Sequence, residues 1–140
     1  MRPLSYPLTS LNTRWQAVLA VALLLLVAGC GERPERHLDL GLWYFQKGLV
    51  DDAVLEFKEV IRLSPADPRS MSPRQLDMVT HAHYNLAVAY AKKQWFELAL
   101  AEAGISFDLR PTTKNRELRE LIRKRQNLES LAPDLAPLRD

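Results

Sequence analysis

Residues 38–65 read LDLGLWYFQKGLVDDAVLEFKEVIRLSP, and residues 84–111 read YNLAVAYAKKQWFELALAEAGISFDLRP. The second stretch repeats the residue types of the first at a constant offset of 46 positions, which marks an internal repeat. In each stretch, apolar residues recur at helical spacing on two segments joined by a short turn. Pro65 and Pro111 end these patterns, because proline lacks the backbone N–H that a helix needs. Each stretch therefore predicts a pair of amphipathic helices.

The repeat resembles the tetratricopeptide family, whose unit of about 34 residues carries small, aromatic and proline residues at set positions. On that pattern one unit spans residues 34–67 and a second spans 80–113. The resemblance implies an all-α fold of antiparallel helix hairpins, here two repeats. The matching residues are Leu40, Gly41, Tyr44, Ala53, Phe57 and Pro65 in the first unit and Leu86, Ala87, Tyr90, Ala99 and Pro111 in the second.

The two units depart from the family pattern in several places. His37 and His83 stand where the family has tryptophan, and Ala103 stands where it has phenylalanine. The extra residues 68–79 separate the units, and Ser72 to Gln75 has the form of a capping box with proline at the first helical position. We therefore expect the first helix of the second unit to run from about Pro73 to about Lys93.

The turns inside the two hairpins differ in sequence. Gly48 sits in the first turn, where a positive φ is easily adopted. The equivalent residue in the second turn is Gln94. The substitution predicts that the second turn is built differently.

A further helix is expected over residues 114–131, with an apolar stripe of Leu118, Leu121, Ile122 and Leu128. It resembles the terminal capping helix of such arrays, which covers the exposed face of the last repeat. The helical domain is thus predicted to span 35–131. Residues 132–140 contain two prolines and are expected to form an extended, mobile tail.

The beginning of the chain has the parts of a secretory signal. An uncharged, mostly apolar run from Trp15 to Ala28 is short for the roughly 20 residues of a membrane span. Val27-Ala28-Gly29-Cys30 ends it and resembles the lipobox of bacterial lipoproteins. The resemblance implies a signal peptide over 1–29, acylation of Cys30 and a short tether over 30–34. It places the protein in the bacterial cell envelope, and Gly31 favours the outer membrane.

The charge balance argues against nucleic acid as a partner. The chain has 19 basic and 17 acidic residues, a formal net charge of +2. Arg2 and Arg14 lie in the leading segment and account for this excess, so the rest of the chain is neutral. A neutral domain lacks the general electrostatic attraction that nucleic acids require.

The titratable residues predict neither a metal site nor a catalytic site. His37 and His83 occupy equivalent repeat positions, which favours a packing role for both. His81 and His83 point in roughly opposite directions on a helix, and Asp77 with His81 could supply only two ligands. No catalytic triad order, phosphate loop or metalloprotease motif occurs in the sequence. The sequence therefore predicts a protein that is not an enzyme and uses no cofactor.

Two surfaces are candidates for binding. The resemblance places a mostly apolar inner face on the first helices of the units, which suits an amphipathic helix or an extended peptide. The chain's own tail or a second copy is the alternative occupant. Basic residues on one arc of the last helix are either a solvated face or a contact for anionic lipid or an acidic partner. The inner-face residues are Leu38, Leu42, Phe45, Gln46, Tyr84, Val88, Ala91 and Lys92, and the arc residues are Arg116, Arg119 and Arg123.

The predicted function is that of a membrane-anchored scaffold that holds a protein partner at the envelope, as in envelope, pilus or secretion assembly. The alternative is an accessory regulator of an envelope enzyme such as a peptidoglycan hydrolase or a protease. About three repeats are usually needed for a stable array, so either the C-terminal helix supplies the missing cover or the protein forms a homodimer.

Overall fold

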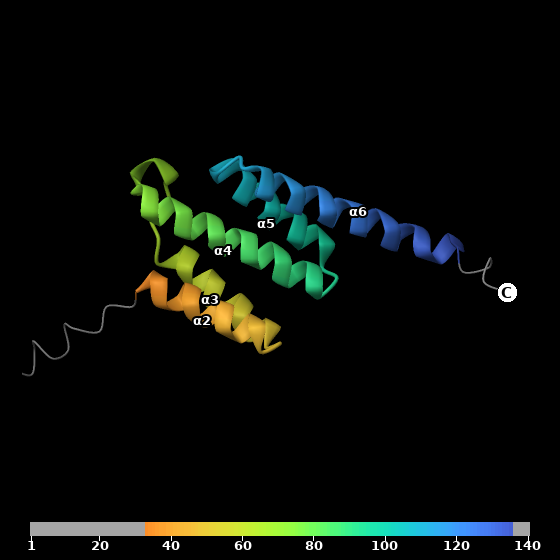
Figure 1. Ribbon diagram of the computed structural model, residues 1–140, viewed down its shortest axis with the longest axis horizontal. Coiled ribbons are helices and arrows are strands. Elements are labelled where there is room, and N and C mark those ends of the chain that lie inside the picture. Colours follow the sequence, from red (N-terminus) through yellow and green to blue (C-terminus); the bar gives the residue numbers. More distant parts are fainter. Residues whose placement is uncertain (1–32, 136–140) are drawn as a thin grey trace, which may run out of the picture. The chain divides into compact units, whose positions relative to one another are not determined.

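The computed structural model describes residues 33–135, with side chains from 33 to 131. The predicted signal peptide and Cys30 lie outside these residues. The chain forms only helices here, without any strand, which confirms the all-α prediction (Figure 1). The elements are α2 (Pro34–Gln46), α3 (Val50–Arg62), a short 3-10 helix η1 (Pro68–Ser70), α4 (Pro73–Lys92), α5 (Phe96–Leu109) and α6 (Thr113–Leu135).

Two antiparallel hairpins and one added helix make up the fold. Helices α2 and α3 form the first hairpin, α4 and α5 form the second, and α6 packs along α5. Helix α4 joins the hairpins because it packs against α3 as well as α5 and also touches α2. The predicted hairpins and the predicted C-terminal helix are therefore all present.

Small residues allow the helices to cross closely. Ala53, Ala87 and Ala99 are fully buried, as the repeat pattern predicts. A Cβ atom built on Gly41 would lie only 2.6 Å from Cε1 of Phe57, so the aromatic ring fills the space that glycine leaves. The core is thus fixed by pairs of small and large residues, as close packing requires.

The start of α4 agrees with its sequence signals. The hydroxyl of Ser72 accepts from the backbone N–H of Gln75, and the Gln75 side chain accepts from the backbone N–H of Ser72. This capping box confirms the predicted helix start at Pro73. The early turns of α4 bury Met78 and Ala82 against Val60 of α3, so they form a second small core.

The second hairpin turn corrects one sequence prediction. Gly48 has a φ of 80°, as expected, but Gln94 also has a positive φ, at 62°. The two turns are therefore built alike. An L-residue in this region costs about 1–2 kcal/mol, and the packing of the flanking helices evidently outweighs it.

The end of α6 corrects a second sequence prediction. The sequence predicts an end at Leu131, but the helix continues to Leu135 and passes through Pro133. Proline fixes φ near −65°, which is a helical value, although inside a helix it also removes one hydrogen bond and crowds the carbonyl of the preceding turn. The predicted extended tail is thus wrong for residues 132–135, and residues 136–140 lie outside the described part.

Candidate functional site

A groove lies between the C-terminal half of α4, the start of α5 and α6. It has a volume of about 650 Å³. Ile122 and Leu118 of α6 are 2% and 9% exposed, and together with the half-buried Val88 and Phe96 they form its apolar base. Its outer wall consists of leucines from α6 that remain more than half exposed. These are Leu121, 58% exposed, and Leu128, 57% exposed.

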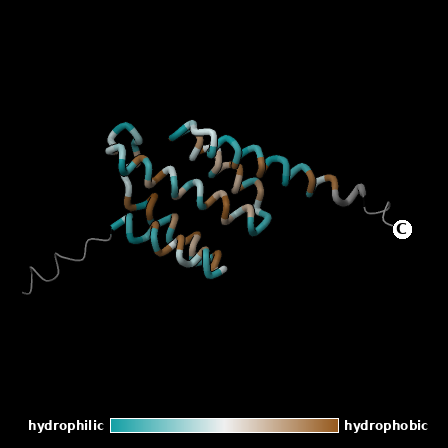
Figure 2. The backbone as a smooth tube through the Cα atoms, viewed as in Figure 1, coloured by the Kyte–Doolittle hydropathy of each residue, from teal (hydrophilic) through white to brown (hydrophobic). Residues whose placement is uncertain are grey.

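The groove exists because α6 is docked on α5 by one face only. Asn115 at the start of α6 donates to the backbone oxygens of Ser106, at 3.1 Å, and Arg110, at 2.8 Å. Leu118 and Ile122 then join the same core cluster as Ala99 and Ala103. The remaining surface of α6 is largely hydrophilic with isolated hydrophobic positions (Figure 2). The leucines of the groove wall are among those positions.

The predicted inner-face residues divide into two groups. Val88, Ala91 and Lys92 line the groove. Leu38, Phe45 and Tyr84 are half-buried and pack against the core, and Leu42 and Gln46 are exposed on α2 outside the groove. The structure therefore brings the α4 residues to the site and adds α6 residues that the repeat pattern did not indicate.

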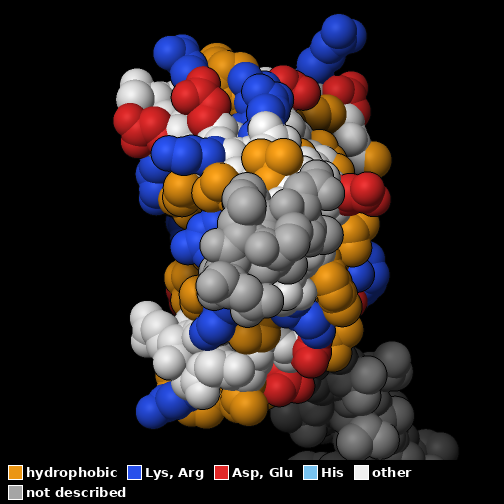
Figure 3. Space-filling model, turned by 90° about the vertical axis from the view of Figure 1, so that its right-hand side faces the viewer, with side chains coloured by type: hydrophobic (Ala, Val, Ile, Leu, Met, Phe, Trp, Pro, Cys, Tyr) orange, Lys and Arg blue, Asp and Glu red, His pale blue; other side chains and the backbone are white. Residues whose placement is uncertain are grey.

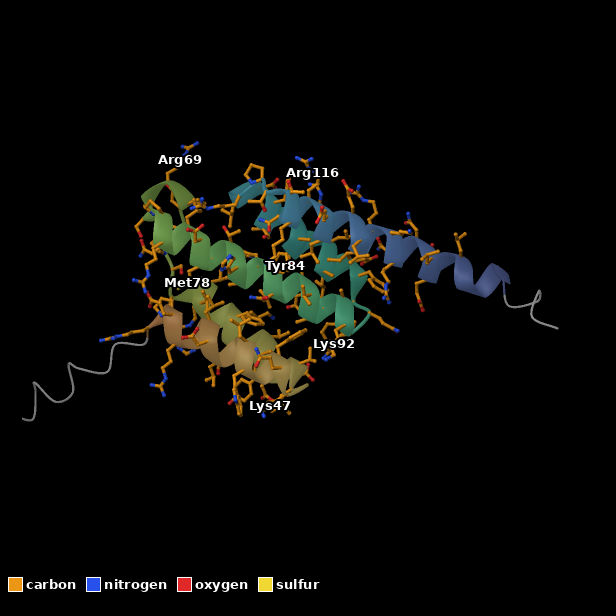
Figure 4. All side chains as sticks on the ribbon, in the orientation of Figure 1. Lys47, Arg69, Met78, Tyr84, Lys92 and Arg116 are labelled. Carbon is orange, nitrogen blue, oxygen red and sulfur yellow. The ribbon has the colours of Figure 1, made fainter. Side chains whose placement is uncertain are left out.

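Positive charge follows the border between α4 and α6. The ammonium of Lys92 lies 5.1 Å from the centre of the Phe45 ring, and that of Lys114 lies 4.5 Å from the Tyr84 ring. In Figure 4, Tyr84 lies midway along α4 and Lys92 lies at its C-terminal end. Arg125 also lines the groove, and none of these three cations forms an ion pair within residues 33–131. Glu129 is the one acidic residue of the groove lining, so cations outnumber carboxylates there, and the groove favours an occupant with acidic residues.

The predicted basic arc of α6 is interrupted. The guanidinium carbon of Arg119 lies 4.4 Å from the Phe107 ring, and this side chain is half-buried against α5. The guanidinium carbon of Arg116 lies 5.9 Å from the same ring, and both Arg116 and Arg123 are exposed. Arg119 thus helps to dock α6 and is not part of a free arc, since a guanidinium over an aromatic ring is partly desolvated.

The histidines make a repeated contact that the sequence analysis missed. Nδ1 of His37 lies 2.7 Å from a carboxylate oxygen of Glu56, and Nδ1 of His83 lies 2.6 Å from one of Glu102. Each pair joins the two helices of one hairpin. Glu56 and Glu102 are themselves 46 positions apart, so the offset that revealed the other shared positions could have found them.

A second cavity, of about 480 Å³, lies beneath the connection between α3 and α4. His83 lines it, but its Nδ1 is engaged by Glu102. Ser64 also lines it and donates its hydroxyl to the backbone oxygen of Val60, at 2.7 Å. The cavity therefore presents apolar surface and no hydroxyl free to act as a nucleophile beside the imidazole.

Two further acidic residues are engaged with cations. A carboxylate oxygen of Asp77 lies 2.7 Å from Nε of Arg110, so Asp77 pairs with Arg110 and not with His81. Asp51 at the start of α3 contacts Lys93. No group of His, Cys, Asp and Glu within the described residues could hold a metal ion. None of the helices between residues 33 and 135 combines the length and apolarity needed to span a bilayer.

Comparison with known protein families, with curated proteins and with solved structures finds no match to this chain. The geometry of the hairpins and of the groove therefore carries the functional argument.

Proposed function

We propose that this protein is a non-enzymatic scaffold of the tetratricopeptide type, which holds a segment of a partner protein in the groove between α4 and α6. One observation carries the proposal: Leu121 and Leu128 are more than half exposed on the wall of an apolar groove. Although they are separate positions on α6, both leucines line one groove with the apolar residues of its base, and a large exposed apolar surface of this kind marks an interaction site.

The shape and charge of the groove favour an amphipathic helix as its occupant. Leu121 and Leu128 are seven residues apart on α6, which is the spacing at which a facing helix presents its own apolar residues. Lys92 and Arg125 line the groove with a single acidic residue, Glu129, so the excess of cations favours an occupant that carries acidic residues beside its apolar stripe.

The leading sequence supports a place at the bacterial envelope. Cys30 follows the apolar run and the small pair Ala28-Gly29, which is the arrangement of a lipoprotein signal. Acylation adds about 0.8 kcal/mol of membrane affinity for each buried methylene, so more than one chain gives stable anchoring. The scaffold would then hold its partner beside a membrane, with the outer membrane favoured by Gly31.

Site-specific photocrosslinking in the native host tests the groove. A photoreactive residue at position 121 or 128 should capture the same partner. The matched control is position 55, because Leu55 is 62% exposed on α3 and does not line the groove. Equal capture at all three positions, or none at 121 and 128, would contradict the proposal. A captured envelope hydrolase or protease would make the scaffold an accessory of that enzyme.

Fatty-acid labelling tests the anchor separately. The wild-type chain should incorporate labelled palmitate and fractionate with membranes, whereas Cys30→Ser should do neither. Labelling of the Cys30→Ser variant at the wild-type level would exclude the lipid anchor and leave the groove proposal standing.

A further inference from the structure

The outer face of α5 is apolar where a solvent-facing helix is normally polar. Leu98 is 51% exposed, Ile105 is 41% exposed and Ala101 between them is also exposed. Helix α5 also buries Ala99 and Ala103 on its other side, so apolar residues occur on both of its sides. An exposed apolar face on such a helix is a candidate for further burial.

The first repeat provides an internal comparison for this face. At four of the five equivalent positions α3 carries charged residues, the exception being Leu55, and Glu59 forms an ion pair of 2.6 Å with Arg62. Both helices are the second helix of their hairpin, so the repeat fold alone does not demand an apolar outer face. The equivalent pairs are Asp52 and Leu98, Leu55 and Ala101, Lys58 and Gly104, Glu59 and Ile105, and Arg62 and Asp108.

The chemistry of the α5 face defines what can cover it. Ala101 and Gly104 are small, and a Cβ atom built on Gly104 would meet nothing within 4 Å, so a second helix can approach closely. Glu97 and Asp108 are exposed beside the apolar residues, and α5 has no lysine or arginine. The matching surface is therefore a helix with large apolar residues and flanking cations.

Helix α6 has such a surface on the side that does not face α5. Leu121, Leu128 and Leu131 are 58%, 57% and 51% exposed. Lys124 falls on the same stripe, because positions 121, 124, 128 and 131 follow helical spacing. Arg123 is also exposed beside it. The face seen in Figure 3 has hydrophobic side chains interspersed with lysine, arginine and acidic side chains.

We propose that two copies of this chain pair by placing the α6 stripe, Leu121 to Leu131, of each on the outer face of α5 of the other. Both surfaces are exposed in one chain, and Leu98 borders an open hollow of about 680 Å³ that the same chain's α6 also lines. A reciprocal exchange of the two surfaces closes as a two-fold dimer. The acidic flank of α5 meets the basic residues of α6. Pairing also adds helix layers to an array of only two repeats, fewer than the roughly three usually needed.

Pairing has a consequence for the groove. Leu121 and Leu128 belong both to the α6 stripe and to the wall of the groove. A paired molecule therefore has a covered groove wall, and pairing competes with partner binding.

Sedimentation equilibrium of residues 33–140 tests the dimer. This segment contains every residue of the two core clusters and the helices that carry them. Circular dichroism verifies that it folds. The wild-type segment should show a monomer–dimer equilibrium between micromolar and near-millimolar concentration. The variants E97K/D108K and R123E/K124E should each weaken dimerisation about tenfold, because each places like charges together. Combining all four changes should restore it, and D52K on α3 should have no effect.

Three results would overturn the proposal. A monomer at every concentration excludes the dimer. A dimer that neither charge reversal weakens has another interface. If E97K/D108K weakens dimerisation and the addition of R123E/K124E does not restore it, then α5 pairs with something other than α6. The measurement contains no partner protein, so its failure leaves the scaffold proposal intact.

Discussion

Single residues set how closely the helices of this protein pack. Gly41 lies beneath Phe57, and a methyl group on Gly41 would lie 2.6 and 2.8 Å from Cε1 and Cδ1 of the ring. Gly104, in contrast, faces open space on α5. The same residue type therefore has opposite roles at the two sites, since one glycine is needed for packing and the other is not.

Replacing each glycine by alanine should separate these roles. Gly41→Ala should destabilise residues 33–140 by about 1–3 kcal/mol, because overpacking outweighs the gain in helix propensity. Gly104→Ala should stabilise it by up to about 1 kcal/mol, because the change only reduces backbone entropy in the unfolded chain. Urea unfolding at a concentration that keeps the protein monomeric gives both values. Stabilisation by Gly41→Ala would contradict the contact with Phe57.

The two His–Glu contacts should differ in strength. The side chains of His83 and Glu102 are 11% and 21% exposed, and those of His37 and Glu56 are 21% and 20% exposed. Double-mutant cycles with alanine should give a coupling free energy of about 0.5–1.5 kcal/mol for the first pair and a smaller one for the second, because a more exposed contact competes with water. A coupling of zero in both cycles would mean that the pairs only fill space.

At the scale of elements, α6 has one apolar face that is buried against α5 and other apolar residues that remain exposed. Its buried face carries Leu118 and Ile122 onto α5, while Leu121 and Leu128 remain exposed. Adjacent residues on the helix thus have different surroundings. The buried face determines where α6 lies, and the exposed face is what the groove and the proposed dimer use.

Alanine substitutions at neighbouring positions test this division. Ile122→Ala should cost about 2–4 kcal/mol, because the side chain is 2% exposed and its loss leaves a cavity. Leu121→Ala should change the stability of the monomer by less than about 0.5 kcal/mol, since surface substitutions rarely do more. Thermal unfolding followed by circular dichroism measures both. Equal costs would mean that α6 is rotated about its axis relative to this structure.

At the scale of the whole molecule, α4 makes the two hairpins one folding unit. It packs against α3 and touches α2 in the first hairpin while pairing with α5 in the second. Neighbouring repeats that share such an interface unfold together when the interface is strong relative to each repeat. The two hairpins are therefore expected to unfold in a single transition.

The tryptophans report on this cooperativity. Trp43 lies in the first hairpin and Trp95 immediately precedes α5 in the second. In residues 33–140, Trp43→Phe leaves a reporter for the second hairpin and Trp95→Phe leaves one for the first. In each variant, the denaturant midpoint by fluorescence should equal that by circular dichroism. A separate midpoint for either hairpin would show that α4 does not couple them.

Local signals in the sequence were enough to predict the helices of this protein. Pro65 and Pro111 bound the hairpins, the Ser72–Gln75 capping box starts α4, and the alanines at shared positions mark the close crossings. Predictions from these features agree with the structure because each feature depends on a few neighbouring residues and on backbone geometry that a side chain fixes directly. The repeat offset then predicted two equivalent hairpins.

Long-range packing decided what those local signals left open. Gln94 adopts the turn that glycine adopts in the first hairpin, and Arg119 stacks on Phe107 instead of facing solvent. The groove likewise depends on the distance and rotation between α4 and α6, which no local pattern encodes. The sequence by itself determined which segments are helices, because helix formation is local; only the tertiary structure decided which helix faces remain uncovered, because burial depends on partners distant in the chain.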